Sequence, residues 1–148
     1  MSSERGELES MFRFQIVITA FICFWLNPSW AETVISCGEI KGYAYYLGDP
    51  DFVPDQARDS SFTLTRDGDA YDVIFYDVTK RPRSSRSEGA KVLQVDRTET
   101  SVTIFVGYPG YHNTALWTFD LDKKKMVYSQ HRLGGISPKI AILKAECF

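Results

Sequence analysis

The chain has 148 residues, with 17 Lys and Arg against 19 Asp and Glu, so its net charge is only −2. A balance so near zero argues against general binding to nucleic acid or to anionic membranes. The length suits a single domain with one hydrophobic core.

The N-terminal segment is typical of an export signal. Ile16–Leu26 is an unbroken apolar run, too short to span a bilayer comfortably but of the length found in signal peptides. Ser29-Trp30-Ala31 follows as a small-x-small cleavage pattern, so residues 1–31 are predicted to be a signal peptide cut after Ala31. The first ten residues are acidic, which makes Met11 a better start for an export signal. An uncleaved anchor helix is the alternative.

Two cysteines, Cys37 and Cys147, lie near the two ends of the predicted mature chain, because Cys23 leaves with the signal. An exported protein meets an oxidising compartment, so we expect these two cysteines to form a disulfide. Closing so long a loop stabilises a fold by about 4–5 kcal/mol in the chain-entropy model. Two free thiols are one alternative. A metal site is the other, but only two histidines remain and no ligand spacing is recognisable.

Residues 32–148 are predicted to form one all-β domain, since no stretch has convincing helical periodicity. Ser36–Leu47 opens the domain as a tyrosine-rich strand. Gly48–Ser60 follows as a long acidic loop, because it contains two prolines and four aspartates and has no periodicity.

Ser61–Val78 is predicted to be a β-hairpin. Asp67-Gly68 between two alternating apolar runs is a strong turn signal, because a type I′ turn needs positive φ at both central residues. With this turn Leu64 is expected opposite Tyr71, so that the apolar side chains share one face.

Thr79–Gly89 is predicted to be a second long loop, basic where the first is acidic. Two further hairpins and a last strand follow, separated by the turn loops Gly107–Asn113 and Gly134–Pro138. The five remaining strands are predicted at Ala90–Asp96, Ser101–Tyr108, Thr114–Leu121, Met126–Leu133 and Lys139–Cys147.

This count gives an antiparallel meander of about eight strands. In an up-and-down order the first and last strands run antiparallel, so Cys37 would lie beside Cys147, as a disulfide requires. An eight-stranded closed β-barrel meets this condition and removes both sheet edges. A two-layer β-sandwich is the alternative. The architecture is similar to small exported bacterial β-barrels, including lysozyme-inhibitor and lipocalin-like proteins, and this resemblance concerns the fold alone.

The meander sorts the connections into two ends. The short turns at Asp67-Gly68, 97–100 and 122–125 lie at the end with the termini, and the long loops lie at the other. Binding sites commonly lie on such loops and in the mouths of barrels. We therefore expect partner-binding residues at the long-loop end, and the candidates are Phe52, Arg81, Arg83, Arg86, Tyr108, Tyr111 and His112.

No catalytic constellation is recognisable. His112 and His131 have no nucleophile or carboxylate at a suggestive spacing. The aspartates around Asp67 and those of the 48–60 loop do not follow the EF-hand pattern and read as solvated turn residues. No catalytic residue, metal site or cofactor is predicted.

The basic run Lys80–Arg86 is the only cationic cluster. It suits an anionic partner, such as a phosphate, a carboxylate or an acidic protein surface. A solubilising loop is the ordinary reading of the same residues. Tyr108 and Tyr111 are expected to offer contact area, whereas Trp117 shares a face with Phe119 and is expected in the core.

The sequence therefore favours an exported, non-enzymatic binding module, periplasmic or secreted and with a weak indication of bacterial origin. Its expected partner is a protein or another macromolecule at the long-loop end. A carrier of a small apolar ligand inside a lipocalin-like barrel is the alternative. A barrel filled by large side chains such as Phe62 and Phe119 would disfavour it. No nucleic-acid partner and no membrane span in the mature chain are expected.

Overall fold

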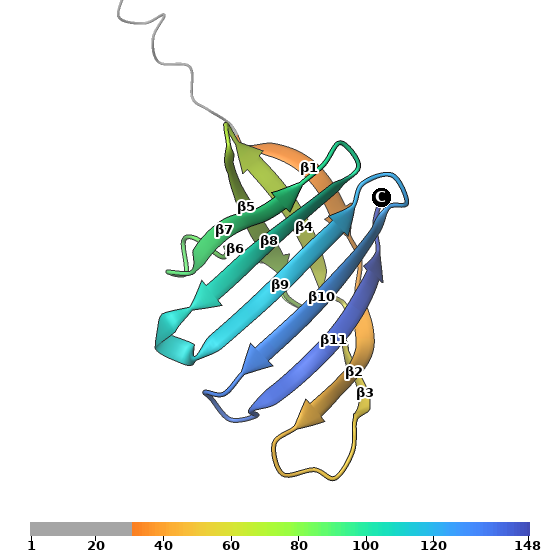
Figure 1. The fold of residues 1–148 in the computed structure, drawn as a ribbon, viewed down its shortest axis with the longest axis vertical. Helices are drawn as coiled ribbons and strands as arrows, with labels where there is room; N and C mark the ends of the chain where they lie inside the picture. Colours follow the sequence, from red (N-terminus) through yellow and green to blue (C-terminus); the bar gives the residue numbers. More distant parts are fainter. Residues whose placement is uncertain (1–30) are drawn as a thin grey trace, which may run out of the picture. The chain divides into compact units, whose positions relative to one another are not determined.

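Two antiparallel β-sheets make up residues 31–148, the part of the chain that this computed structural model describes (Figure 1). The smaller sheet has the order β1-β4-β5-β6 and the larger has the order β3-β2-β11-β10-β9-β8-β7. The strands are β1 Glu32–Cys37, β2 Ile40–Tyr46, β3 Val53–Ala57, β4 Ser61–Asp67, β5 Ala70–Tyr76, β6 Pro82–Ser84, β7 Lys91–Arg97, β8 Ser101–Tyr108, β9 Asn113–Asp120, β10 Lys125–Arg132 and β11 Lys139–Glu146.

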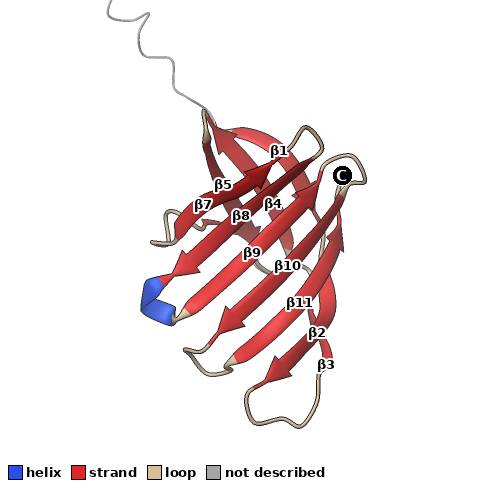
Figure 2. Ribbon diagram, in the orientation of Figure 1, coloured by secondary structure: helices blue, strands red, loops and turns tan. Residues whose placement is uncertain are grey.

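The prediction of an all-β fold is confirmed. Among the described residues the one helical element is the short 3-10 turn η1, Pro109–Tyr111 (Figure 2). Residues 31–148 form one compact unit. The predictions made for residues 1–30, including the signal sequence and the start at Met11, lie outside the described residues.

One bent hairpin runs through both sheets. The chain passes from β1 to β2 at Gly38–Glu39, and from β3 to β4 over residues 58–60. The same two chain segments stay paired on both sides of the bend, because Cys37 pairs with Phe62 in one sheet and Ile40 pairs with Ala57 in the other. The two sheets are therefore continuous along this side.

Two strands lie inside segments predicted to be loops. β3 falls within Gly48–Ser60, where Pro54 and Asp55 disfavour a strand on propensity. β3 is the edge of the larger sheet, and an edge strand tolerates a proline that cannot donate to the ladder. β6 falls within Thr79–Gly89 and pairs with β5, and Ser85 beside it is buried. The prediction of loops was therefore wrong for the residues of β3 and β6.

The predicted hairpin is confirmed with a different register. Leu64 pairs with Val73 rather than with Tyr71, so the predicted register is off by two positions. The two-residue turn is Gly68-Asp69, and Gly68 adopts a φ of 58°, which glycine reaches at no steric cost. A shift of two positions keeps each side chain on its expected face, and the predicted apolar face is therefore retained.

The predicted disulfide is confirmed, with Cys37 and Cys147 joined at an S–S distance of 2.02 Å. Beside it the amide of Phe148 donates to the carbonyl oxygen of Ser36 at 2.8 Å. The end of the last strand is thus attached to β1 through both covalent and backbone contacts, as predicted. The predicted count of about eight strands was wrong, because the described residues form eleven strands in two sheets.

On the opposite side β5 and β7 lie close together, but the ladders of the described strands do not join them (Figure 1). Here a side chain bridges the gap, which we call the seam. The Arg86 guanidinium donates from Nε to the carbonyl oxygen of Tyr71 in β5 at 2.8 Å, and from Nη2 to that of Val92 in β7 at 3.0 Å. The structure therefore shows two antiparallel sheets and does not establish the closed barrel that the sequence predicted.

Candidate functional site

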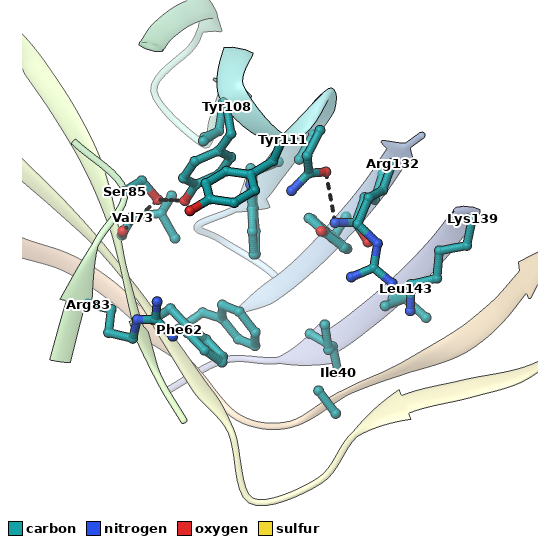
Figure 3. A pocket seen from close by; sticks show the side chains of 18 of the residues that line it. Ile40, Phe62, Val73, Arg83, Ser85, Tyr108, Tyr111, Arg132, Lys139 and Leu143 are labelled. Carbon is teal, nitrogen blue, oxygen red and sulfur yellow. Dashed lines mark hydrogen bonds between the residues drawn. The ribbon is translucent and has the colours of Figure 1, made fainter. Parts of the chain in front are cut away.

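A cavity of about 730 Å³ lies between the sheets, toward the end that carries the long loops. Its walls combine aromatic and aliphatic side chains with a few charged ones (Figure 3). Exposed Tyr111 and Arg83 form part of its lining, so the cavity is open to solvent at this end. The volume falls within the range of about 300–1,000 Å³ that is typical of small-molecule sites.

The inward-facing residues of β9, β10 and β11 explain why one end of the interior is full and the other open. They form four rows of directly paired residues, which are Phe119, Met126 and Ala145; Trp117, Tyr128 and Leu143; Ala115, Gln130 and Ala141; and Asn113, Arg132 and Lys139. The first two rows are buried, and apart from Ala145 their residues are large. The third row contains two alanines, which leave space. The fourth row is polar and lies beside the long loops.

Three aromatic residues form what we call the aromatic floor of the cavity: Phe62, Trp117 and Tyr128. The ring centroids of Trp117 and Tyr128 are 4.2 Å apart, and those of Phe62 and Trp117 are 5.1 Å apart. The indole Nε1 of Trp117 is buried without a hydrogen-bond partner among residues 31–148. The predicted core position of Trp117 is confirmed, and its ring also lines the cavity.

Lys139 and Asp55 form a largely buried ion pair on one wall, with side-chain exposures of 13% and 14%. The Lys139 ammonium also lies 5.4 Å from the centroid of the Tyr46 ring. A second pair, Arg83 and Glu88, joins atoms 2.5 Å apart in a more exposed position. Each of these two cations is therefore matched by a carboxylate.

Arg132 differs from the other cavity cations. Its Nε and Nη2 atoms both donate to the carbonyl oxygen of Ser137, at 3.0 and 2.7 Å. Within the described part of the chain no carboxylate lies within salt-bridge distance of its guanidinium. Arg132 is half-buried and lines the cavity.

Two tyrosine hydroxyls face this environment. The Tyr108 hydroxyl donates to Ser85 Oγ at 3.1 Å, and burial raises the pKa of Tyr108. Burial also raises the pKa of Tyr128, an effect that the positive charge of Arg132 partly opposes. Both phenols are therefore neutral hydrogen-bonding groups at physiological pH.

Close backbone contact fixes the loop beside the fourth row. The amide of Leu133 donates to the carbonyl oxygen of His112 at 3.0 Å. A Cβ atom on Gly134 would lie 2.4 Å from the carbonyl oxygen of Tyr111, so only glycine allows this approach. The loop before β11 is thus packed against η1.

The structure brings together three of the predicted partner-binding residues, since Arg83, Tyr108 and Tyr111 line the cavity. Phe52 lies in the β2–β3 loop, 57% exposed, with its ring 5.7 Å from that of Tyr45. Arg81 is exposed outside the cavity lining. The other two predicted residues are also outside it: Arg86 bridges the seam, and His112 is exposed at the end of η1 with a φ of 46°.

His131 is exposed on β10, and no group of three or more potential metal-ligating His, Cys, Asp or Glu side chains occurs within residues 31–148. Over the same range, no helix has the length and apolar character needed to cross a membrane.

Four cavity residues were not predicted, because they lie in strands and the predicted site was confined to loop residues and strand ends. They are Tyr128, Gln130, Arg132 and Lys139. A signal was present in the alternation of β10. Met126, Tyr128, Gln130 and Arg132 share the inward face and become steadily more polar toward one end. An inward face that turns polar indicates a lined, open interior rather than a packed one.

No family model, no curated protein and no solved structure matches this chain.

Proposed function

We propose that this protein is an exported small-molecule-binding protein that holds a largely apolar ligand in the cavity. The observation that carries the proposal is an open space of about 730 Å³ with an aromatic floor at one end and polar residues at the other. Ligand sites in proteins typically combine such apolar walls with a few placed polar groups. The proposal assigns the protein no catalytic step and places it in the periplasm or outside the cell.

We propose further that the meander acts as a partly open barrel. The shared hairpin and the disulfide join the sheets on one side, and the Arg86 bridge holds β5 to β7 on the other. In such an arrangement the large residues near the termini form a plug, while the third row leaves the other half free for a ligand.

Native mass spectrometry on gently purified, exported protein tests the proposal. We expect a fraction of the protein to carry extra mass that is lost on denaturation. An Ala115→Leu variant, which adds bulk to the open row, should lose this extra mass and remain folded. Leu116→Phe, a similar enlargement on the outer face of the same strand, is the matched control.

Absence of bound mass in the exported protein, followed by no heat of binding with any apolar or amphipathic probe, would contradict the proposal. Equal loss of ligand from the Ala115→Leu and Leu116→Phe variants would place binding elsewhere on the molecule.

A macromolecular partner remains the second candidate, because exposed apolar side chains gather at the long-loop end. Phe52, Tyr111, Leu133 and Ile136 are between 57% and 104% exposed. Such side chains commonly mark interaction surfaces. If this surface binds a protein, Ile136→Lys should abolish co-purification of that protein without lowering the melting temperature or displacing a ligand from the cavity.

A further inference from the structure

We propose that the ligand of this cavity carries an anionic head group, in its simplest form a carboxylate, which binds Arg132. This inference depends on the proposed function, because it names the chemical class of the ligand at the same site.

Among the charged residues that line the cavity, one cation has no carboxylate partner. The charged lining residues are Asp55, Arg83, Glu88, Arg132 and Lys139. Lys139 is paired with Asp55, and Arg83 with Glu88. Arg132 is the remaining charge, and a cationic ligand would find both carboxylates already neutralised. The electrostatics of the lining therefore favour an anion.

Hydrogen bonds position the guanidinium of Arg132 and leave part of it free to bind such a head group. Its two hydrogen bonds to the Ser137 carbonyl oxygen use Nε and one hydrogen of Nη2. Arginine has five N–H donors, so three remain, two of them on Nη1. A guanidinium matches a carboxylate in shape and charge, and one that is already positioned loses little freedom on binding.

A second donor lies in the aromatic floor itself. Tyr128 lines the cavity, and burial keeps its phenol protonated, so its hydroxyl can donate a hydrogen bond. Tyr128 and Arg132 lie on the same inner face of β10, with Gln130 between them. A carboxylate near Arg132 would place an attached apolar chain over Phe62 and Trp117, which line the same cavity.

Isothermal titration calorimetry on the exported protein tests the inference with decanoate and 1-decanol. These probes share their apolar chain and differ in the head group. We expect decanoate to bind at least about tenfold more tightly than 1-decanol, since a hydrogen bond to a charged group typically changes an affinity by that factor or more. Arg132→Met should remove this preference for decanoate and leave the affinity for 1-decanol within about twofold.

Lys125→Met is the matched control, because it removes one positive charge from the opposite end of the same strand. It should leave the affinities for both probes unchanged. If Arg132→Met does not fold, the comparison of the two probes on the unmodified protein still decides the question.

The outcomes separate the inference from the proposed function. Equal affinity for decanoate and 1-decanol, or an Arg132→Met variant that retains the preference, overturns the inference and leaves the proposed function intact. Binding of neither probe overturns the inference, and it overturns the proposed function as well when the exported protein also carries no bound mass.

Discussion

The ion pair between Lys139 and Asp55 is the most buried charge pair of the described structure, and it lies in the wall of the cavity. Lys139 comes from β11, whereas Asp55 comes from the edge strand β3. β3 and β11 both pair with β2 and are not neighbours in the sheet, so the ion pair reaches across β2 on the inner face. The pair therefore helps to hold an edge strand that has few apolar contacts of its own.

We predict that Lys139→Met destabilises the protein by about 2–4 kcal/mol. The substitution leaves the Asp55 carboxylate largely buried without its counter-charge. Removing one partner of a buried ion pair costs more free energy than the intact pair contributes to stability. Urea denaturation of the variant measures the change. The double variant Lys139→Met with Asp55→Leu should recover most of the lost stability, and failure to recover would show that the loss comes from packing of the lysine stem.

Among the elements, the seam between β5 and β7 depends on side chains from the β6–β7 connection. Arg86 supplies the bridge, and Asp72 of β5 holds the connection by accepting from the Arg86 amide at 3.2 Å and from the Ser84 hydroxyl. Ser85 adds a hydroxyl bond of 3.0 Å to the carbonyl oxygen of Val73. A segment that the sequence presents as a polar loop is thus a structural connection.

We predict that Arg86→Met destabilises the protein by about 1–3 kcal/mol, since two carbonyl oxygens lose a charged donor. Hydrogen exchange should accelerate first at the amides of β7. Arg81→Met, in the neighbouring β5–β6 connection, exposed and outside the seam, should change neither stability nor exchange. Identical behaviour of the two variants would show that the bridge is not what holds the seam.

At the scale of the whole molecule, the disulfide determines how far the ends of the fold can separate. Cys37 and Cys147 are 110 residues apart in the chain, so their bond closes a loop that includes nearly every strand. In the chain-entropy model such a cross-link restricts the unfolded chain far more than the native one.

We predict that reduction, or the double variant Cys37→Ser with Cys147→Ser, lowers stability by about 4–5 kcal/mol. For a domain of this size the melting temperature should fall by about 15–20 °C. Differential scanning calorimetry with and without reductant measures it, and the double variant should not respond to reductant. An unchanged transition after complete reduction would contradict the entropic argument.

How much could be predicted from the sequence depends on the kind of signal. The disulfide and the hairpin at Asp67-Gly68 were predictable, because cysteine placement and turn chemistry are local and strong. β3 and β6 were not, since Pro54 and the short Pro82–Ser84 segment argue against strands, and only tertiary pairing determines them. The seam could not be predicted either, because an arginine that binds two distant carbonyl oxygens has no sequence pattern.

The site was predictable in its location and only partly in its residues. The long loops indicate the end of the molecule at which the cavity opens, and Arg83, Tyr108 and Tyr111 at that end line it. Arg132 was not predicted, because it stands at the end of an alternating strand, where a polar residue is expected to be solvated. Whether side chains fill the interior depends on which residues pair across neighbouring strands. Ala115 and Ala141 indicate open space only when both are known to pair with Gln130.

The position of Trp117 has a spectroscopic consequence. It is the only tryptophan among residues 31–148, and its ring forms part of the aromatic floor. In a chain processed after Ala31, all indole fluorescence would therefore come from the wall of the cavity. The emission wavelength would shift as water there is exchanged for an apolar occupant, so the processed protein would report its own occupancy without an added dye.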